Sequence, residues 1–281
     1  MPGASLRAGR HGCEASTVTA EDVTLDRLTA ACETDSRVVA AFLGGSRARG
    51  AEDAYSDVDV TVLVLDEERE AFVADREAFV SAIGTPLFLE DFGLEHVTFV
   101  IFDDGVELEL HVWPIGDLDA IEAGPHRVLY DARDVLASAA FPEEQLQPDV
   151  LRDELRQVLT WFWHDLGHLR TALGRAQIWW AAGQVEQLRN ACVRLARLEH
   201  RLPSGDEPYW KVDLEVPTAA LDPLRSTFVP PDLSAMLAAG LDLLRFFREH
   251  GRTAARAMDV AYPEELDHLV GGELERLASE D

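Results

Sequence analysis

The sequence predicts an α+β protein in two parts: an N-terminal domain with a small mixed β-sheet flanked by helices, and a C-terminal all-α helical bundle. Short segments that alternate apolar and polar residues, as strands do, lie in the first half. The second half repeats apolar residues at steps of three and four, the spacing of amphipathic helices. A chain of 281 residues has the length of two ordinary domains. We expect them at 17–145 and 146–281, with the boundary in the polar stretch between Pro142 and Pro148.

The first elements follow in order from these patterns. Residues 22–33 have a helical pattern, and residues 38–43 form a short apolar run of strand type that Gly44-Gly45 ends. Residues 57–65 alternate valine with polar residues, which predicts a half-buried strand with its acids on the exposed face. Residues 67–83 carry the apolar stripe of a helix.

A hairpin and a last strand complete the predicted sheet. Residues 96–102 and 106–113 are strand candidates, and Asp103-Asp104-Gly105 between them is a strong hairpin signal. A short strand at 127–130 and a helix from Ala132 would finish a mixed α/β unit.

Four helices are predicted in the second half. The longest covers 151–176, and another covers 184–202. A loop rich in Pro and Gly then reaches Pro217, and two further helices cover 233–250 and 263–277. We find no internal repeat in the sequence.

The composition is strongly acidic, with 52 acidic residues against 25 basic ones and a net charge of −27. Such a surface repels nucleic acid and anionic membranes and attracts cations, so a cationic small molecule is the expected partner. The same charge can also serve solubility alone. The three cysteines Cys13, Cys32 and Cys192 are far apart and predict neither disulfides nor a thiolate metal site. With no signal-peptide pattern and no long apolar run, we expect a cytoplasmic protein; its oligomeric state does not follow from the sequence.

The segment Gly44-Gly45-Ser46 and the strand after it form the first candidate site. Glycines at the end of a strand let the backbone approach a ligand, and backbone N–H groups with the Ser46 hydroxyl can cradle phosphate oxygens. Asp57 and Asp59 lie two apart on one strand, so both carboxylates project from the same face. Carboxylates held this close repel one another unless a cation lies between them, and Mg²⁺ is the hard ion that prefers oxygen ligands.

A third acid is expected from the strand at 106–113. Its alternation places Glu107 and Glu109 on the face opposite the apolar residues. We choose Glu109 as the third carboxylate and keep Glu107 as the alternative.

These residues together resemble the DNA polymerase β-like nucleotidyltransferase superfamily. The resemblance covers residues 36–113 and consists of Gly44 to Gly50 with its Gly-Ser turn, Ser56 to Asp59 with its Asp-x-Asp, and an acid on a later strand. It implies that Asp57 and Asp59 bind one or two Mg²⁺, and that Glu109 is either a further metal ligand or the base that deprotonates the acceptor hydroxyl. It also implies that the nucleoside triphosphate, ATP by preference, contacts a set of residues around the turn: Gly45, Ser46, Arg47, Arg49 and Ser56.

The second half resembles the helical domain of aminoglycoside and lincosamide nucleotidyltransferases. The similar segments are 161–198 and 261–266. In those enzymes a long helix carries an Arg-Gly-Asp/Glu-like segment; here Arg175 matches it and Ala176-Gln177 departs from it. The resemblance implies a nucleotidyltransferase domain at 17–145 and a substrate-binding helical domain at 146–281, with the active site in the cleft between them.

The function implied by this resemblance is transfer of AMP from ATP to a hydroxyl of a small molecule, with pyrophosphate leaving. An aminoglycoside-type antibiotic is the first expectation for the acceptor, and a lincosamide is the second. Two alternatives stay open: a nucleotidyltransferase that modifies a protein or tRNA, as in toxin–antitoxin systems, and a regulatory module that binds nucleotide without catalysis.

Other chemistry-bearing residues receive ordinary structural interpretations. His164 and His168 lie four apart on the long helix, but no third metal ligand is apparent in the sequence, so we expect a helical pair without metal. We also expect the four tryptophans of this region to pack between helices: Trp161, Trp163, Trp179 and Trp180.

Overall fold

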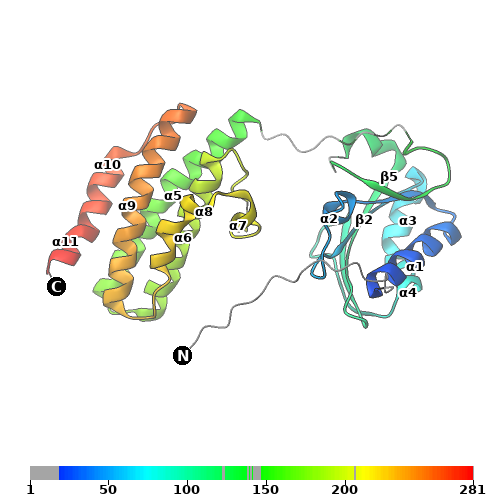
Figure 1. Cartoon of the computed structure of the whole chain (residues 1–281), viewed down its shortest axis with the longest axis horizontal. Helices are drawn as coiled ribbons and strands as arrows, with labels where there is room; N and C mark the ends of the chain where they lie inside the picture. Colours follow the sequence, from blue (N-terminus) through cyan, green and yellow to red (C-terminus); the bar gives the residue numbers. More distant parts are fainter. Residues whose placement is uncertain are drawn as a thin grey trace, which may run out of the picture. The chain divides into compact units, whose positions relative to one another are not determined.

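A computed structural model describes residues 19–121, 124–137, 139, 141, 147–205 and 207–280. The chain divides into two compact units, residues 1–145 and 146–281 (Figure 1). The stretch around Pro142 in which we expected the boundary, residues 142–146, lies outside the described residues, as does Cys13. The predicted α+β class is confirmed, since a six-stranded mixed sheet occupies the first unit and helices form the second.

The sheet has the order β3-β4-β5-β2-β1-β6. Only β2 and β5 pair in parallel among the described strands, and the other neighbours are antiparallel. The strands are β1 (Val38–Leu43), β2 (Val58–Val64), β3 (Pro86–Glu90), β4 (Val97–Phe102), β5 (Glu107–Pro114) and β6 (Arg127–Asp131). The parallel pair places residues far apart in sequence side by side at the centre of the sheet.

Helices cover one face of this sheet. They are α1 (Ala20–Thr34), α3 (Arg69–Ala74) and α4 (Arg76–Ile83), and their apolar residues pack on the valines of β2 and the leucines of β5. Thr19 begins α1 with a reciprocal capping box to Asp22. This face holds the main core of the unit.

The opposite face is also covered over part of its area, which corrects the prediction of a half-buried strand at 57–65. Leu63 of β2 and Phe42 of β1 are fully buried there, packed with Ile121 and Leu136 from the segments around β6. Asp59, nearer the start of β2, lies outside this second core and is only partly buried. The acids therefore occupy the open end of a face whose other end is covered.

Three further expectations for this unit were wrong. The helix expected over 67–83 is broken at Asp75, preceded by a short 3₁₀ turn (Asp66–Glu68), and Arg37 donates to the carbonyl of Ala71 at the break (3.5 Å). Strand β3 was not predicted; it begins at Pro86, and proline suits the first residue of an edge strand.

The helix expected from Ala132 is absent from the described residues that follow β6. The Asp131 carboxylate instead accepts hydrogen bonds from the backbone N–H groups of Val135 (2.9 Å) and Leu136 (2.8 Å). Asp134 adopts a left-handed conformation (φ 57°), which ends any helical path. A local side-chain turn replaces the helix here.

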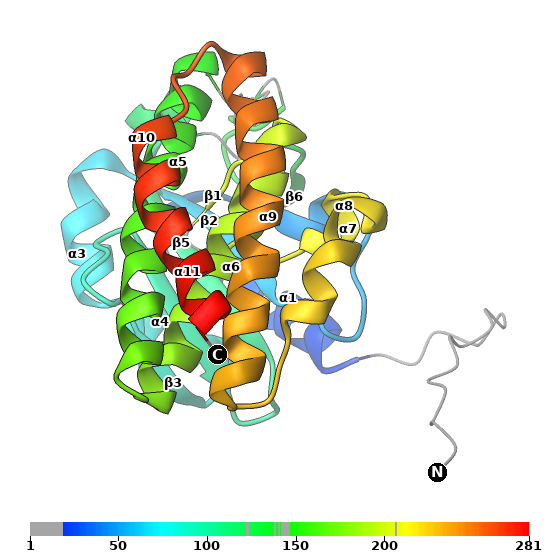
Figure 2. The ribbon, with the colours of Figure 1, turned by 90° about the vertical axis from the view of Figure 1, so that its left-hand side faces the viewer.

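The second unit is built on three long helices, α5 (Pro148–Gly174), α6 (Ile178–Glu199) and α9 (Leu233–Met258) (Figure 2). Phe162 of α5 stacks on Phe247 of α9 with ring centroids 3.6 Å apart, and both side chains are fully buried. Shorter helical segments complete the unit: α7 (Val212–Glu215), α8 (Thr218–Leu221), a 3₁₀ turn (Asp222–Thr227), α10 (Glu264–Leu266), a π turn (Asp267–Gly271) and α11 (Gly272–Glu280). Among the described residues no helix is both long and apolar enough to cross a membrane.

Two helix ends in this unit were predicted wrongly because we placed them at glycines. We began the second helix after Gly183 and ended the third near Gly251, but both glycines lie inside helices. Gly183 is exposed, so it weakens α6 only through its own low helix propensity. At Gly251 an added Cβ would lie 3.2 Å from Leu159 and from Tyr262, so this glycine permits close packing and does not end the helix.

The segment after α5 forms a left-handed turn although Ala176 stands where the Arg-Gly-Asp/Glu-like segment of the related enzymes has glycine. Arg175 is exposed and caps α5, and Ala176 has φ 52° in the left-handed region that favours glycine. The N–H groups of Ala176 and Gln177 close the helix end on the carbonyls of Leu173 and Ala172, both at 2.9 Å. A glycine at position 176 would therefore adopt this backbone conformation without strain.

We expect Ala176→Gly to raise the free energy of unfolding of the helical unit by about 0.5–1 kcal/mol, because it removes the strain of a left-handed alanine. The same exchange at the exposed helical position Ala238 should lower it by about 1 kcal/mol. Urea unfolding followed by tryptophan fluorescence measures both, since five of the six tryptophans lie in this unit. Equal destabilisation by the two variants would contradict the explanation.

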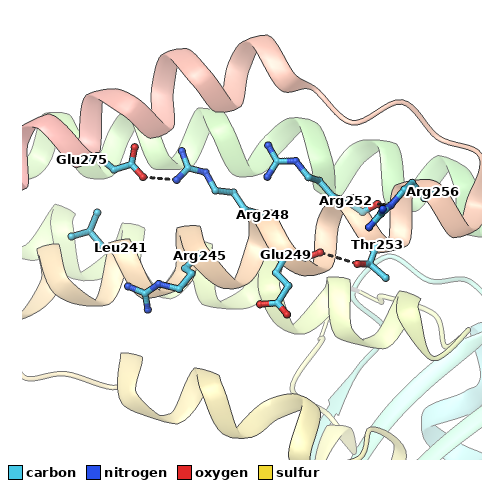
Figure 3. Close-up of a pocket in the computed structure, with 8 residues that line it drawn as sticks. All are labelled: Leu241, Arg245, Arg248, Glu249, Arg252, Thr253, Arg256 and Glu275. Carbon is cyan, nitrogen blue, oxygen red and sulfur yellow. Dashed lines mark hydrogen bonds and ion pairs between the residues drawn. The ribbon is translucent and has the colours of Figure 1, made fainter.

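Asp267 ties the C-terminal segment to α9. Its carboxylate is buried (3% exposed) and accepts from Arg248 Nε (2.7 Å), Arg252 Nη2 (2.6 Å) and the Tyr262 hydroxyl (3.1 Å). Arg248 also bonds Glu275 beside a cavity of about 490 Å³ along α9 (Figure 3). The segment at 261–266 that resembles the related enzymes therefore contributes to a structural ionic cluster.

Asp267→Asn should lower the free energy of unfolding of the helical unit by about 2–3 kcal/mol, because it leaves two arginines without their buried counter-charge. Glu275→Gln removes a half-exposed partner of Arg248 and should change stability by only about 0.5 kcal/mol. Both values come from the same urea titration. A loss below about 1 kcal/mol in Asp267→Asn would show that the cluster contributes little.

Candidate active site

Three carboxylates converge where β2 and β5 begin. In the parallel pairing of these strands Asp59 lies directly beside Glu109, and Asp57 immediately precedes β2. Ligand oxygens of Asp57, Asp59 and Glu109 all lie within 4.8 Å of one another. Asp57 is exposed and the other two are partly buried, so the group faces solvent at one side. The structure thus brings together the three acids that the sequence analysis selected.

Glu107, the alternative third acid, is not one of the three. It lies at the exposed start of β5 and pairs across the sheet with Ile101 of β4. The register of β5 against β2 places Glu109, and not Glu107, beside Asp59. Glu107 is therefore a natural control residue for Glu109.

The two glycines after β1 have different parts in this site. Gly44 continues the sheet, since its N–H donates to the Asp59 carbonyl (3.1 Å). Gly45 begins the short helix α2 (Gly45–Ala48) with φ 57°. A Cβ on Gly45 would lie 1.7 Å from Asp59 Oδ2, whereas one on Gly44 would be 3.9 Å from the nearest atom, the Asp59 Cβ. Only the second glycine is therefore required for the Asp59 carboxylate to keep its place.

The residues expected to hold nucleotide lie around this turn, but two of them make internal contacts. Arg47 is 8% exposed, and its Nε donates to the backbone carbonyl of Asp57 (3.1 Å). The Ser56 hydroxyl lies 3.2 Å from the Asp53 carboxylate and accepts from the Asp53 N–H (3.0 Å). Arg47 and Ser56 thus fix the loop that leads into Asp57.

Of the remaining predicted nucleotide contacts, Ser46 and Arg49 are more accessible than Arg47. Ser46 is partly buried in α2, and its carbonyl accepts from the N–H groups of Arg49 (3.1 Å) and Ala51 (3.0 Å). The Arg49 side chain is exposed. Of the two arginines, Arg49 is the one with a side chain available to a phosphate.

His111 is a residue of this site that the sequence analysis did not select. Its Nε2 lies 2.9 Å from Glu109 Oε1, and both side chains are about 30% exposed (31% and 29%). The alternation of β5 places the two residues on one face, which is the signal that would have found it. His111 thus holds one oxygen of the Glu109 carboxylate.

The donor set fits a hard divalent cation. All three groups offer oxygen, which Mg²⁺ prefers, and their mutual repulsion falls when a cation lies between them. Asp57, Asp59 and Glu109 are thus the residues that would hold the metal.

A mixed sheet that carries three clustered acids beside a Gly-Gly-Ser turn is the arrangement expected of a nucleotidyltransferase. The sequence matches the family of streptomycin adenylyltransferases over residues 19–275, and the chain belongs to this family. This confirms the resemblance to aminoglycoside nucleotidyltransferases that the motifs indicated, and the protein is an enzyme of the nucleotidyltransferase class.

Two solved structures are similar to the chain at low sequence identity. An aminoglycoside 6-adenyltransferase from Bacillus subtilis is 15% identical with a TM-score of 0.43, and the match covers 90% of this chain and 97% of that one. A nucleotidyltransferase-like protein from Exiguobacterium sibiricum is 11% identical with a TM-score of 0.37, over 93% and 88%. No curated protein sequence matches the chain.

Gly45→Ala should abolish nucleotidyl transfer, because the added methyl group would displace the Asp59 carboxylate and the left-handed φ disfavours alanine. We expect a rate loss of at least about 100-fold. Gly44→Ala adds the same methyl group one residue earlier, where it makes only an ordinary contact, and should retain activity within about threefold. Circular dichroism checks that both variants fold. Similar activity in the two variants would contradict the tight packing of Gly45 on Asp59.

Proposed function

We propose that this enzyme transfers AMP from ATP to a hydroxyl group of an aminoglycoside-type antibiotic. The observation that carries the proposal is the convergence of Asp57, Asp59 and Glu109 in a chain of the streptomycin adenylyltransferase family. The cytoplasm supplies ATP and Mg²⁺, and we propose that the enzyme acts there.

At the nucleotide end, the turn after β1 receives the triphosphate. Backbone N–H groups and the Ser46 hydroxyl bind its β- and γ-phosphates, and the exposed Arg49 guanidinium adds a charge-assisted contact. Arg47 and Ser56 act indirectly, because they fix the loop before Asp57. When bound by the three carboxylates, Mg²⁺ would supply charge neutralisation and alignment of the triphosphate for in-line attack.

At the acceptor end, a hydroxyl oxygen of the antibiotic attacks the α-phosphorus of ATP. The bond from that phosphorus to the bridging oxygen of the β-phosphate breaks, and pyrophosphate leaves with the electron pair. One carboxylate oxygen of Glu109 takes the hydroxyl proton, and His111 holds the other, Oε1, in place. We assign Glu109 both this role and a share in binding the metal.

The charge of the chain favours a cationic acceptor. Aminoglycosides are polycations, and a net charge of −27 raises their concentration near the surface. The effect is long-ranged and falls with ionic strength. It therefore supports the acceptor class and does not select the hydroxyl that is modified.

A pyrophosphate-release assay with ATP and Mg²⁺ over a panel of aminoglycosides and lincosamides tests the proposal. We expect turnover with at least one aminoglycoside and none with lincosamides. Asp57→Asn and Asp59→Asn should each lower the rate by about 1000-fold or more, because each removes a charged metal ligand worth several kcal/mol in the transition state. Mass spectrometry of the product should show the added AMP.

Glu109→Gln and Glu107→Gln form the matched pair for this assay. Glu109→Gln should lose at least about 100-fold in rate and need more Mg²⁺ for half-maximal activity, whereas Glu107→Gln should stay within about twofold. An unchanged Mg²⁺ requirement in Glu109→Gln would restrict that residue to proton transfer. Full activity in Asp57→Asn or Asp59→Asn would show that this aspartate is not a metal ligand. Turnover with lincosamides alone would show that the acceptor is a lincosamide and not an aminoglycoside.

A further inference from the structure

A second group of possible metal ligands lies on α5, in the helical unit. It consists of His164, Asp165 and His168, which occupy positions i, i+1 and i+4 of the helix. One ligand atom from each lies within 4.8 Å of the others. From the sequence we found no third ligand for the two histidines; the structure adds Asp165, the neighbour of His164 in the chain. All three belong to one helix.

The distances suit a single ion. His164 Nδ1 and Asp165 Oδ1 are 3.1 Å apart, and the two imidazole rings have centroids 4.1 Å apart. Two donors that bind one zinc ion at about 2.0–2.1 Å are roughly 3–3.4 Å apart, depending on the angle between them. The spacing of His164 Nδ1 and Asp165 Oδ1 already falls in this range, and rotation of the imidazole rings would bring the nitrogen of His168 to the same ion.

Aromatic neighbours restrict those rotations. Trp161 packs edge-on against His164 (centroids 5.1 Å, planes at 81°), and Trp180 of α6 lies 5.4 Å from the ring of His168. Trp161 is 59% exposed, so it does not pack between helices as we expected. Rings held in this way lose less conformational freedom when they bind an ion.

The donor chemistry separates this group from the carboxylate site. Two imidazoles and one carboxylate suit Zn²⁺ and other late first-row ions, whereas Mg²⁺ prefers oxygen alone. His164 is exposed and the other two residues are partly buried, so water has access to the remaining coordination positions. The two groups would therefore select different metals from a mixture.

We propose that His164, Asp165 and His168 form a binding site for a divalent transition metal, with Zn²⁺ as its representative ion. The site is independent of nucleotidyl transfer and of the Mg²⁺ bound by the catalytic carboxylates. Because its ligands span one turn of α5, bound metal stabilises that helix and raises the stability of the helical unit in proportion to metal concentration above the dissociation constant.

Isothermal titration of the full chain with Zn²⁺, without nucleotide, tests the site. The wild-type protein should show one Zn²⁺ bound more tightly than the dispersed surface carboxylates bind it, and excess Mg²⁺ should not displace it. His164→Ala and His168→Ala should each weaken this site by at least about 100-fold, since loss of even an outer-sphere partner costs 10–100-fold. His200→Ala, which removes an exposed histidine at the end of α6, should leave the titration unchanged.

Two further measurements keep the outcome unambiguous. The double variant Asp57→Asn, Asp59→Asn should bind Zn²⁺ as the wild type does. Loss of tight Zn²⁺ binding in this variant would show that the metal binds at the catalytic carboxylates, and this would overturn the proposal. Electron paramagnetic resonance of the wild-type protein with one equivalent of Cu²⁺ should show two coordinated nitrogens. A spectrum without nitrogen coupling, or unchanged Zn²⁺ affinity in both histidine variants, would also overturn it.

Discussion

The parallel pairing of β2 with β5 is the constraint on which the site depends. It places Asp59 directly beside Glu109, although 50 positions separate them in the chain. Adjacent strands are about 4.8 Å apart, so two carboxylates on one face must meet at close range. The pairing is held by the core beneath it, where Val58, Val60 and Leu108 are buried. Burial of apolar side chains on one face thus holds the carboxylates close together on the other.

The same face of the sheet serves two purposes along its length. At Leu63 and Trp113 it is covered by a small second core, and at Asp59 and Glu109 it is open. Gly45, with its left-handed backbone, lets the turn after β1 approach Asp59 more closely than any other residue type would allow. The Arg47 side chain donates to the backbone carbonyl of Asp57, and His111 contacts the carboxylate of Glu109, so both acids are held in place. Rigid neighbours of this kind are what an active site needs to hold its charged groups in position.

Much of this arrangement could be predicted from the sequence because local patterns record it. The valines of β2 and the leucines of β5 alternate with acids, which gave both strands and the face that the acids share. The Asp-Gly turn at Gly105 correctly predicted the β4–β5 hairpin. What could not be predicted depends on tertiary contacts. Pro86 begins a strand, Gly251 packs against α5, and Arg47 turns inward to a carbonyl. His111 could have been selected from the strand alternation alone, and Asp165 from its position next to His164 in the chain.

The most direct test of the central claim is a crystal structure of the enzyme grown with Mn²⁺ and a non-hydrolysable ATP analogue. Mn²⁺ replaces Mg²⁺ at oxygen sites and is located by its anomalous scattering. We expect an anomalous peak bonded to carboxylate oxygens of Asp57, Asp59 and Glu109, with the triphosphate on the turn that contains Ser46. A structure with the nucleotide bound and no metal peak at these three carboxylates would contradict the proposed site.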